Sequence, residues 1–230
     1  MEKIKIIVTG DGSHSLLNEA LDETYHSRHG AVRESLHVFI EHGFNHLLIT
    51  QTPKSISVLE VGFGTGLNAL LTLAEAEKNN VTVAFTSVET NPLPKEVWMN
   101  LNYPDPNNFF NVIHQANWQK WCAINTHFSL FKIEKPIQKV ELLPSHYDLI
   151  YFDAFAPNKQ AEMWELEVLD KVAKALKPGG VFVTYCAKGQ LKRDLKSLGL
   201  VVESLPGPPG KREMVRATKR DLFNVTIQLE

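Results

Sequence analysis

The chain has 230 residues, of which 43% are hydrophobic and 22% are charged, so it is long and apolar enough for one large domain with a real core, or for one domain with an appendage. No stretch is long and apolar enough to cross a bilayer, and the first residues turn polar too early for a secretory signal. Cys122 and Cys186 lie far apart without metal-type spacing, which fits a reduced cytoplasmic protein better than a disulfide scaffold.

The formal net charge of −2 excludes a uniformly basic nucleic-acid binder, but the charges are unevenly distributed. Residues 188–220 hold nine Lys or Arg and three acidic residues, a net +6, which leaves 15 basic and 23 acidic residues elsewhere, a net −8. A basic C-terminal face on an acidic body could steer a polyanion towards the protein. A solvated helix face followed by a polar hairpin explains the same pattern, so both interpretations stay open.

The first fifty residues carry no strand–helix–strand signature. Helical spacing there is confined to residues 32–43, which we expect to pack on the first unit of the sheet. The region also holds six of the nine histidines, His14, His26, His29, His37, His42 and His46. They have no cysteine partner, and His26 and His29 lack the spacing of a zinc protease, so we predict polar loops and no metal site.

From residue 55 onwards, predicted strands and helices alternate. The strands are residues 55–61, 81–89, 127–134, 147–155, 181–187, 200–206 and 212–218. The helices are residues 67–79, 94–101, 161–176 and 189–199. Strands separated by helices predict a parallel sheet covered on both faces, and the final hairpin makes the last strand antiparallel. We therefore predict an α/β fold with a mostly parallel seven-stranded sheet in residues 51–230, preceded by an N-terminal extension, residues 1–50.

Three glycines follow the first predicted strand, in the sequence LEVGFGTGLN. Gly62 permits a tight turn, Gly64 lets a ligand approach the main chain, and Gly66 opens a helix whose free N–H groups face that ligand. A dinucleotide fingerprint, G-x-G-x-x-G, needs a further glycine where this chain has Leu67. The spacing E-x-G-x-G-x-G from Glu60 therefore favours a cradle for S-adenosylmethionine (SAM).

Two acidic residues end other predicted strands, at the edge where open α/β sheets bind ligands. Glu89 ends the second strand and can accept hydrogen bonds from a ribose diol, as in both NAD and SAM folds. Asp153 ends the fourth strand and is followed by Phe155 and Pro157, which stiffen the loop. Methylation of an amine needs a neutral nitrogen, and an ionised carboxylate can orient the amine and take its proton. The alternatives are a surface glutamate at Glu89 and a helix cap at Asp153.

Further stretches make the pattern more specific. They are TGDGSHSLLN and YHSRHGAVRESLHVFI near the start, DAFAPNKQAEMW after the fourth strand, and PGPPGKREMVRA near the end. With these and the glycine motif, nearly the whole chain resembles the methyltransferase domain of the MnmC family of bifunctional tRNA wobble-uridine enzymes and its stand-alone, MnmD-type counterparts. The resemblance implies a Rossmann-like class I SAM-dependent methyltransferase that converts 5-aminomethyl-2-thiouridine at the tRNA wobble position into 5-methylaminomethyl-2-thiouridine.

The resemblance also implies roles for individual residues. The residues that would hold SAM are Glu60, Gly62, Gly64, Gly66, Asn68 and Glu89, with Asp11 and Tyr25 in a lid over the site. Asp153 would stand beside the acceptor nitrogen as the catalytic residue. The substrate would meet Phe155, Pro157, Lys211 and Arg212. The adenine contact is not assigned, because the family's usual Gly-Asp pair is absent and Glu134 and Asn117 are weak substitutes.

The bifunctional enzymes also carry an FAD-dependent domain that makes the aminomethyl group, and this chain has no room for it before Glu230. We therefore expect methyl transfer only, with SAM as cofactor and tRNA as partner, no membrane association and a cytoplasmic location. The sequence predicts no oligomeric state.

Three alternatives remain open. A SAM-dependent methyltransferase acting on a small-molecule or protein amine would share every cofactor residue, and the basic segment favours tRNA over it. Leu67 argues against an NAD-dependent oxidoreductase. The presence of both Glu89 and Asp153 argues against a non-catalytic nucleotide-binding subunit.

Overall fold

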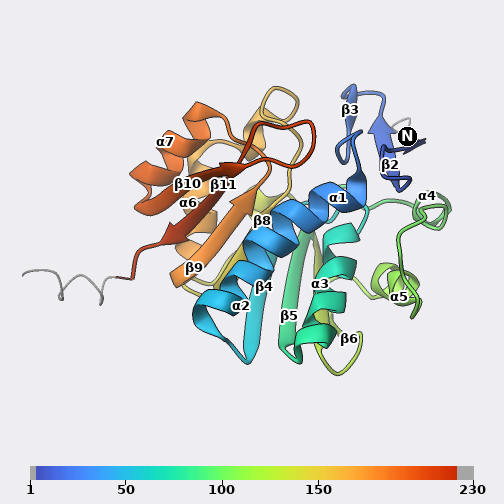
Figure 1. Ribbon diagram of the computed structural model, residues 1–230, viewed down its shortest axis with the longest axis horizontal. Coiled ribbons are helices and arrows are strands. Elements are labelled where there is room, and N and C mark those ends of the chain that lie inside the picture. Colours follow the sequence, from blue (N-terminus) through green and yellow to red (C-terminus); the bar gives the residue numbers. More distant parts are fainter. Residues whose placement is uncertain (1–3, 222–230) are drawn as a thin grey trace, which may run out of the picture.

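The computed structural model describes residues 4–221. The centre of the fold is an eight-stranded sheet (Figure 1). The strand order is β10-β11-β9-β8-β4-β5-β7-β6. The strands are β4 (Ser55–Val61), β5 (Thr82–Glu89), β6 (Trp121–Ala123), β7 (Phe128–Glu134), β8 (Tyr147–Phe152), β9 (Leu176–Thr184), β10 (Leu200–Pro206) and β11 (Glu213–Lys219). Neighbouring strands from β9 to β7 are parallel, whereas β11 is antiparallel to both β9 and β10. The mostly parallel sheet with an antiparallel last strand is therefore confirmed.

The predicted count of seven strands is too low by one within the described residues. The extra strand, β6, pairs antiparallel with β7 at the edge of the sheet. It is three residues long and its Trp121 is 49% exposed, so no alternation of apolar and polar residues marks it in the sequence. Strand β9 also begins earlier than predicted, at Leu176, which pairs with Tyr147 directly after α6 has ended.

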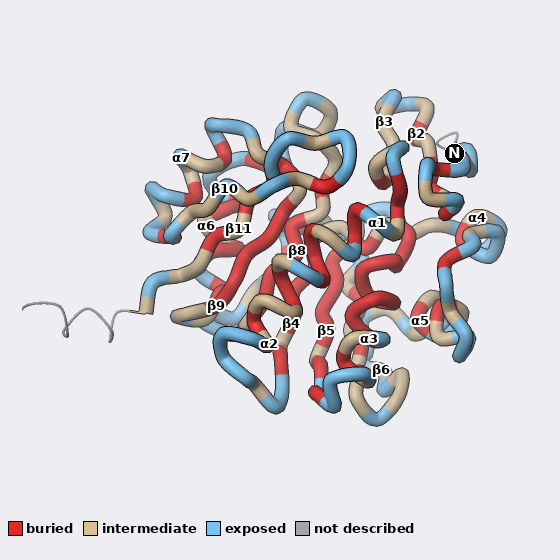
Figure 2. Tube along the Cα trace, viewed as in Figure 1, coloured by how far each residue is buried: buried red, intermediate tan, exposed pale blue. Residues whose placement is uncertain are grey.

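Helices cover both faces of the sheet, as the alternation predicted. They are α1 (Ala31–Ser35), the π-helix η1 (Leu36–Asn45), α2 (His46–Gln51), α3 (Leu67–Asn79), α4 (Lys95–Trp98), α5 (Phe109–Gln115), α6 (Leu166–Ala175) and α7 (Gly189–Ser197), with 3₁₀ turns η2 (Ile137–Lys139) and η3 (Ala161–Met163). Helix α3 has the predicted bounds, α4 and α6 are shorter than predicted, and α5 was not predicted. One apolar cluster joins η1 and α3 to one face, and a second joins α6 and α7 to the other. The central strands are buried along most of their length (Figure 2).

The N-terminal region has two parts. Strands β1 (Ile4–Val8), β2 (His14–Asn18) and β3 (Glu23–Thr24) form a small antiparallel sheet that the sequence did not predict. The helix predicted at residues 32–43 is confirmed, and helical structure continues from α1 through η1 to α2. The division between residues 1–50 and 51–230 stays a prediction.

The π-helix η1 packs closely on the middle of the sheet. A Cβ at Gly43 would lie only 3.0 Å from Val183 Cγ2 and 3.2 Å from Tyr151 Cε1, so glycine allows the helix to approach β8 and β9. Phe39 is buried against Tyr151, with ring centroids 5.1 Å apart. Burial of a side chain such as Phe39 stabilises the fold by roughly 1.5–3 kcal/mol.

Two further predictions concern cysteines and membranes. Cys122 and Cys186 are both free thiols, as their separation in the sequence predicted. Among the described residues no helix combines the length and the apolar character needed to cross a bilayer.

Candidate active site

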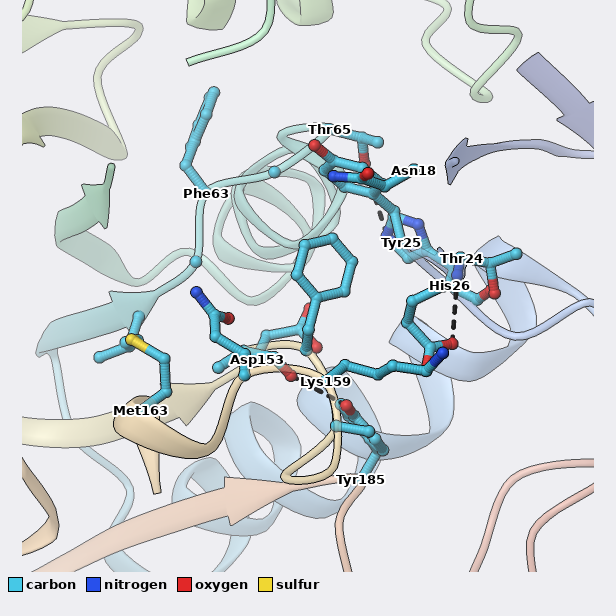
Figure 3. Close-up of a pocket in the computed structure, with 18 of the residues that line it drawn as sticks. Asn18, Thr24, Tyr25, His26, Phe63, Thr65, Asp153, Lys159, Met163 and Tyr185 are labelled. Carbon is cyan, nitrogen blue, oxygen red and sulfur yellow. Dashed lines mark hydrogen bonds between the residues drawn. The ribbon is translucent and has the colours of Figure 1, made fainter. Parts of the chain in front are cut away.

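A cavity of about 490 Å³ opens at the carboxyl ends of β4, β5 and β8 (Figure 3). Strand β4 lies between β5 and β8, so the chain switches direction across the sheet at this point, where open α/β folds bind ligands. The volume lies in the range of small-molecule sites. The walls come from the glycine turn, residues 18–27, the loop after β8 and the β10–β11 loop.

The glycine turn between β4 and α3 needs a bare backbone at each of its three glycines. Gly62, Gly64 and Gly66 have φ angles of +96°, +49° and +74°, in the left-handed region that favours glycine. A Cβ at Gly62 would overlap the carbonyl oxygen of Asp153, and one at Gly64 would lie 3.3 Å from Tyr25 Cδ1. Gly62 and Gly64 line the cavity, while Gly66 caps α3 behind the wall.

The Glu89 carboxylate ties the glycine turn to the end of β5. Its Oε2 accepts a 3.0 Å hydrogen bond from the Gly64 N–H, and its Oε1 accepts a 2.8 Å bond from the Asn91 N–H. Burial raises the pKa of Glu89, and these backbone donors offset part of that increase. Each oxygen keeps acceptor capacity, and Glu89 lines the cavity, so the carboxylate can accept hydroxyl groups there.

Asp153 follows the last residue of β8 and lines the same cavity (Figure 3). Its Oδ2 accepts a 2.9 Å hydrogen bond from Asn68 Nδ2, in the first turn of α3. Burial, followed by the charge of Glu34, raises the pKa of Asp153 to about 7, although Asn68 and Lys211 act in the opposite direction. Asp153 can therefore exchange a proton near neutral pH, which a general base requires.

Lys211 reaches the cavity from the β10–β11 loop. Its Nζ forms a 2.6 Å ion pair with Glu34 Oε1 and lies 3.7 Å from the centre of the Tyr185 ring. Glu34 is 5% exposed, and its Oε2 also accepts a 2.6 Å bond from the Ser27 N–H. Tyr185 donates its hydroxyl proton to the Ala154 carbonyl oxygen at 2.8 Å. This wall is a fixed network of charged and aromatic groups.

Two segments far apart in the sequence meet at the cavity. Tyr25, beside β3, and Phe155, in the loop after β8, pack edge to face with ring centroids 5.0 Å apart. Lys159 Nζ lies 3.7 Å from Asp22 Oδ2 and joins the same two segments. The cavity therefore combines three features. They are the aromatic pair, the Glu89 carboxylate at the end of β5, which can bind a ribose, and the Asp153 carboxyl, whose pKa is about 7.

Comparison with known proteins decides the enzyme class. The sequence model of a family described as S-adenosyl-L-methionine-dependent methyltransferase matches residues 107–220. The crystal structure of MNMC2 from Aquifex aeolicus has a TM-score of 0.80 and 28% identity, over 94% of this chain and 70% of that one. This chain is a SAM-dependent methyltransferase. The predicted Rossmann-like class I fold and the predicted cofactor, SAM, are confirmed, and the oxidoreductase alternative is removed.

Relatives of the methyltransferase carry a more specific name. A protein of Leptospira interrogans is 28% identical over 221 residues, which cover 90% of this chain and 34% of that protein. One of Leptospira borgpetersenii is 31% identical over 215 residues, which cover 86% of this chain and 32% of that protein. Both are named tRNA 5-methylaminomethyl-2-thiouridine biosynthesis bifunctional protein MnmC. The methyltransferase thus spans about a third of the length of these relatives.

The residues around the cavity fit SAM. Gly64 leaves bare backbone at the wall, and the Glu89 carboxylate offers acceptors for a ribose diol. Asn68 is 3% exposed and lines the cavity, where its Nδ2 donates a 2.9 Å hydrogen bond to Asp153 Oδ2 and so fixes that carboxylate in the wall. When bound, SAM supplies an electrophilic methyl group.

Glu60 does not line the cavity and lies fully buried beneath it. Its Oε2 accepts a 2.5 Å bond from the Ser87 hydroxyl, and its side chain also hydrogen-bonds the side chain of Asn68. Burial raises the pKa of Glu60 well above its usual range, and the charge of Asp153 raises it further, which favours the neutral acid. Glu60 therefore supports the site from below and makes no cavity contact of its own.

Several residues singled out in the sequence lie outside the cavity lining. Asp11 accepts bonds from Thr9 Oγ1 at 2.9 Å, the Ser13 N–H at 3.0 Å and the Arg33 N–H at 2.9 Å, so it joins the β1–β2 turn to the start of α1. This bonding fits a structural role at the lid better than contact with SAM. Also outside the lining are Gly66, Pro157, Arg212 and both weak candidates for the adenine contact, Asn117 and Glu134.

The sequence analysis gave no site role to Tyr185, Glu34 or His26, although all three line the cavity. Tyr185 follows β9 directly, and the same strand-end rule that selected Asp153 would have found it. Glu34 lies in a stretch that carried the family resemblance, yet nothing in the sequence placed its helix beside the cavity. His26 is 8% exposed, and burial lowers its pKa to about 4, so it is a neutral wall residue.

Proposed function

We propose that the methyltransferase converts 5-aminomethyl-2-thiouridine at the tRNA wobble position into 5-methylaminomethyl-2-thiouridine. Relatives whose name refers to 5-methylaminomethyl-2-thiouridine biosynthesis in tRNA align with 86–90% of this chain, which supports the proposal. Since this chain covers only 32–34% of those proteins, we do not attribute their complete activity to it. The proposal concerns methyl transfer alone.

One observation carries the proposal: the carboxylate of Asp153 and the glycine turn line one cavity. A primary aliphatic amine is mostly protonated near pH 7 and must lose a proton before it can attack a methyl group. Asp153 accepts an N–H of the amine and holds its lone pair towards the reacting methyl carbon. When bound, SAM would supply the methyl group and leave as S-adenosylhomocysteine, and Asp153 would take the extra proton that the nitrogen carries after methylation. A carboxyl with a pKa of about 7 can do this at neutral pH.

The aromatic pair and the basic loop suit a modified nucleoside on RNA. Tyr25 and Phe155 offer faces on which an extruded base can stack, which typically stabilises binding by about 1–3 kcal/mol per base. Lys211 is held against Glu34 and acts inside the cavity, whereas Arg212 beside it is exposed and free to meet phosphates. This division assigns Lys211 to the nucleoside and Arg212 to the RNA backbone.

The basic segment at residues 188–220 is less basic at its surface than its composition suggests. Lys192 pairs with Glu213, Arg216 pairs with Glu203, and Lys219 donates to three carbonyl oxygens. The exposed basic residues of the segment are Lys188, Arg193, Lys196, Arg212 and Arg220. These are the residues that we assign to tRNA docking.

The test uses tRNA from a strain that accumulates 5-aminomethyl-2-thiouridine, incubated with the protein and SAM carrying a deuterated methyl group. Mass spectrometry of the nucleosides should show 5-methylaminomethyl-2-thiouridine with the labelled methyl. The same tRNA lacking the aminomethyl group should gain no label. Failure to label aminomethylated tRNA, combined with labelling of a free amine or a protein amine, would replace this function with the small-molecule or protein alternative.

A further inference from the structure

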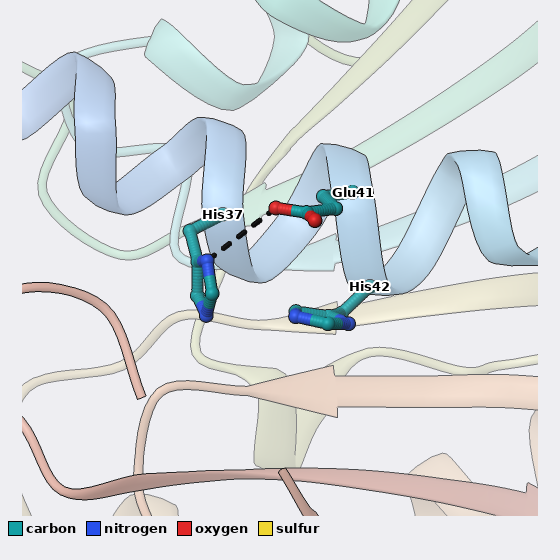
Figure 4. Close-up of side chains that lie close together, drawn as sticks. All are labelled: His37, Glu41 and His42. Carbon is teal, nitrogen blue, oxygen red and sulfur yellow. Dashed lines mark ion pairs between the residues drawn. The ribbon is translucent and has the colours of Figure 1, made fainter. Parts of the chain in front are cut away.

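Three side chains with metal-ligating atoms cluster on η1 (Figure 4). None of them lines the cavity. Donor atoms of His37, Glu41 and His42 all lie within 4.8 Å of one another. His37 Nδ1 is 3.4 Å from Glu41 Oε2, and the two imidazole rings are 4.6 Å apart between centroids. The site already described uses none of the three residues.

The π-helix brings these residues to one face. In an α-helix, positions i and i+4 share a face but position i+5 turns away. A π-helix bonds residue i to residue i+5, so its wider turn places positions 37, 41 and 42 together. Such helical segments are uncommon and often occur at functional sites. The prediction of polar loops was wrong for His37 and His42, which lie in the helix η1, and the sequence spacing did not reveal this helix type.

The ring of His37 is held in a suitable orientation. Its Nε2 lies 2.9 Å from the carbonyl oxygen of Pro206, which can only accept a hydrogen bond, so Nε2 carries the proton. The other ring nitrogen, Nδ1, faces Glu41 Oε2 and is the one available to a metal ion. Histidines that bind metals are commonly oriented in this way by a carbonyl on their second nitrogen.

The surrounding charges permit a cation. Nearby Arg216 is bound through two nitrogens to the carboxylate of Glu203, at 2.9 and 3.2 Å, which offsets its positive charge. Glu41 contributes a negative charge, and its side chain is 66% exposed, so it can turn towards an ion. Water can reach the open side and complete the coordination.

We propose that His37, Glu41 and His42 form a binding site for one late first-row divalent metal ion, represented by Zn²⁺. Two histidines and one glutamate are an established zinc donor set. Zinc bonds of about 2.0–2.2 Å in tetrahedral geometry place neighbouring donors roughly 3.3 Å apart. The 3.4 Å between His37 Nδ1 and Glu41 Oε2 matches this spacing, and rotation of the His42 side chain brings in the third donor. Because Pro206 ends β10, a bound ion would also fix η1 against the hairpin that carries Lys211.

Calorimetry with Zn²⁺ on the untagged, metal-free protein tests the site, together with the visible absorption of Co²⁺. We expect one ion per chain, and His42→Ala or Glu41→Gln should each weaken binding at least about 10-fold. His127→Ala is the matched control, because His127 bonds Asn80 elsewhere on the surface and should leave affinity unchanged.

SAM binding by each variant shows that it is folded, since the three residues lie outside the cavity. Absence of stoichiometric binding by the unaltered protein would overturn the proposal. Folded His42→Ala and Glu41→Gln variants that both keep the affinity of the unaltered protein would overturn it as well. Neither outcome depends on whether tRNA is the substrate.

Discussion

Asn68 Nδ2 donates a 2.9 Å hydrogen bond to Asp153 Oδ2, and this bond joins the two halves of the cavity. Asn68 belongs to the first turn of the helix that follows the glycines, and Asp153 to the end of β8. The bond fixes one carboxylate oxygen and leaves the other for the substrate amine. The proton acceptor is thus held in place by the element that binds the cofactor.

Replacement of Asp153 by asparagine should lower kcat by about 10²–10⁴-fold, because the amide cannot take the proton of the attacking amine. SAM affinity should stay nearly unchanged, since asparagine keeps an oxygen to accept the Asn68 bond. Calorimetry with SAM and single-turnover methylation separate the two effects. Glu162→Gln is a matched control, because Glu162 also lines the cavity but is exposed. Loss of SAM binding in Asp153→Asn would reassign Asp153 to the cofactor.

Activity should rise with pH through about 7. Asp153 must be ionised to act as the base, and its pKa is raised to about 7, so log kcat should climb with unit slope below pH 7 and level off above it. The profile of Asp153→Asn should lack this step. A wild-type profile that is flat between pH 5.5 and 8.5, with chemistry shown to be rate-limiting, would contradict this role.

The stability of the folded protein should fall as pH rises, whereas its activity should increase. The pKa of Asp153 is higher in the folded than in the unfolded protein, so the folded state binds the proton more tightly, and stability is lost as pH rises from about 4 to about 7. Asp153→Asn removes the buried charge. We expect its Tm to exceed that of the unaltered protein at pH 8 by a few degrees, at about 2–4 °C per kcal/mol, with little difference near pH 4. Calorimetric melting at both pH values checks this, and a lower Tm for the variant at pH 8 would contradict it.

Gly62→Ala should weaken SAM binding and destabilise the fold by at least about 2 kcal/mol. The new methyl group would strain a positive φ and overlap the Asp153 carbonyl oxygen. Gly199→Ala isolates the first effect, because Gly199 has φ +85° with no atom within 4 Å of an added Cβ. Denaturant unfolding should show a clearly larger loss for Gly62→Ala. Equal losses would mean that the contact with Asp153 matters little.

Glu89→Gln should weaken SAM binding by about 10–100-fold, because hydrogen bonds to a charged group contribute about 1.5–3 kcal/mol. kcat at saturating SAM should change far less. Glu134→Gln is a close control, since Glu134 lies opposite Glu89 in the register of β5 and β7 but outside the cavity. Calorimetry measures both affinities, and similar losses in the two variants would remove Glu89 from the ribose site.

The salt dependence of tRNA binding should distinguish Arg212 from Lys211. An exposed phosphate contact releases counterions, so Arg212→Ala should reduce the slope of log K against log salt by about 1. Lys211→Met removes a charge already paired with Glu34, so it should leave the slope unchanged and lower kcat/KM instead. Binding titrations at several salt concentrations measure both slopes. A flattened slope for Lys211→Met would place Lys211 on the RNA backbone.

Much of the sheet was predictable because its strands are long, apolar and separated by helices with clear spacing. Strand β4, helix α3 and the strand end at Asp153 depend on local patterns of this kind. The small sheet β1–β3 was not predictable, since its strands have two to five residues and Val8 is 70% exposed. Short strands of this kind depend on pairing partners, which local sequence does not show.

Residues that depend on distant packing were the hardest to predict. Glu34 faces the cavity only because its helix packs beside the glycine turn, and Lys211 reaches Glu34 across 177 residues of sequence. Glu60 was assigned to the cofactor from its motif position, but it lies in the stretch 58–61 of β4, where every residue is buried, and so it stays beneath the site. The charge count along residues 188–220 overestimated the number of unpaired basic side chains. Lys192 and Arg216 form ion pairs with acidic residues of neighbouring strands, which the sequence does not show.

SAM should bind in this cavity with its methyl-bearing sulfur beside Asp153. A crystal structure with S-adenosylhomocysteine tests it most directly. We predict that the ribose hydroxyls bind Glu89, that the backbone at Gly64 contacts the nucleoside, and that the sulfur faces the Asp153 carboxylate. A nucleoside bound outside this cavity, or one whose sulfur points away from Asp153, would contradict the account.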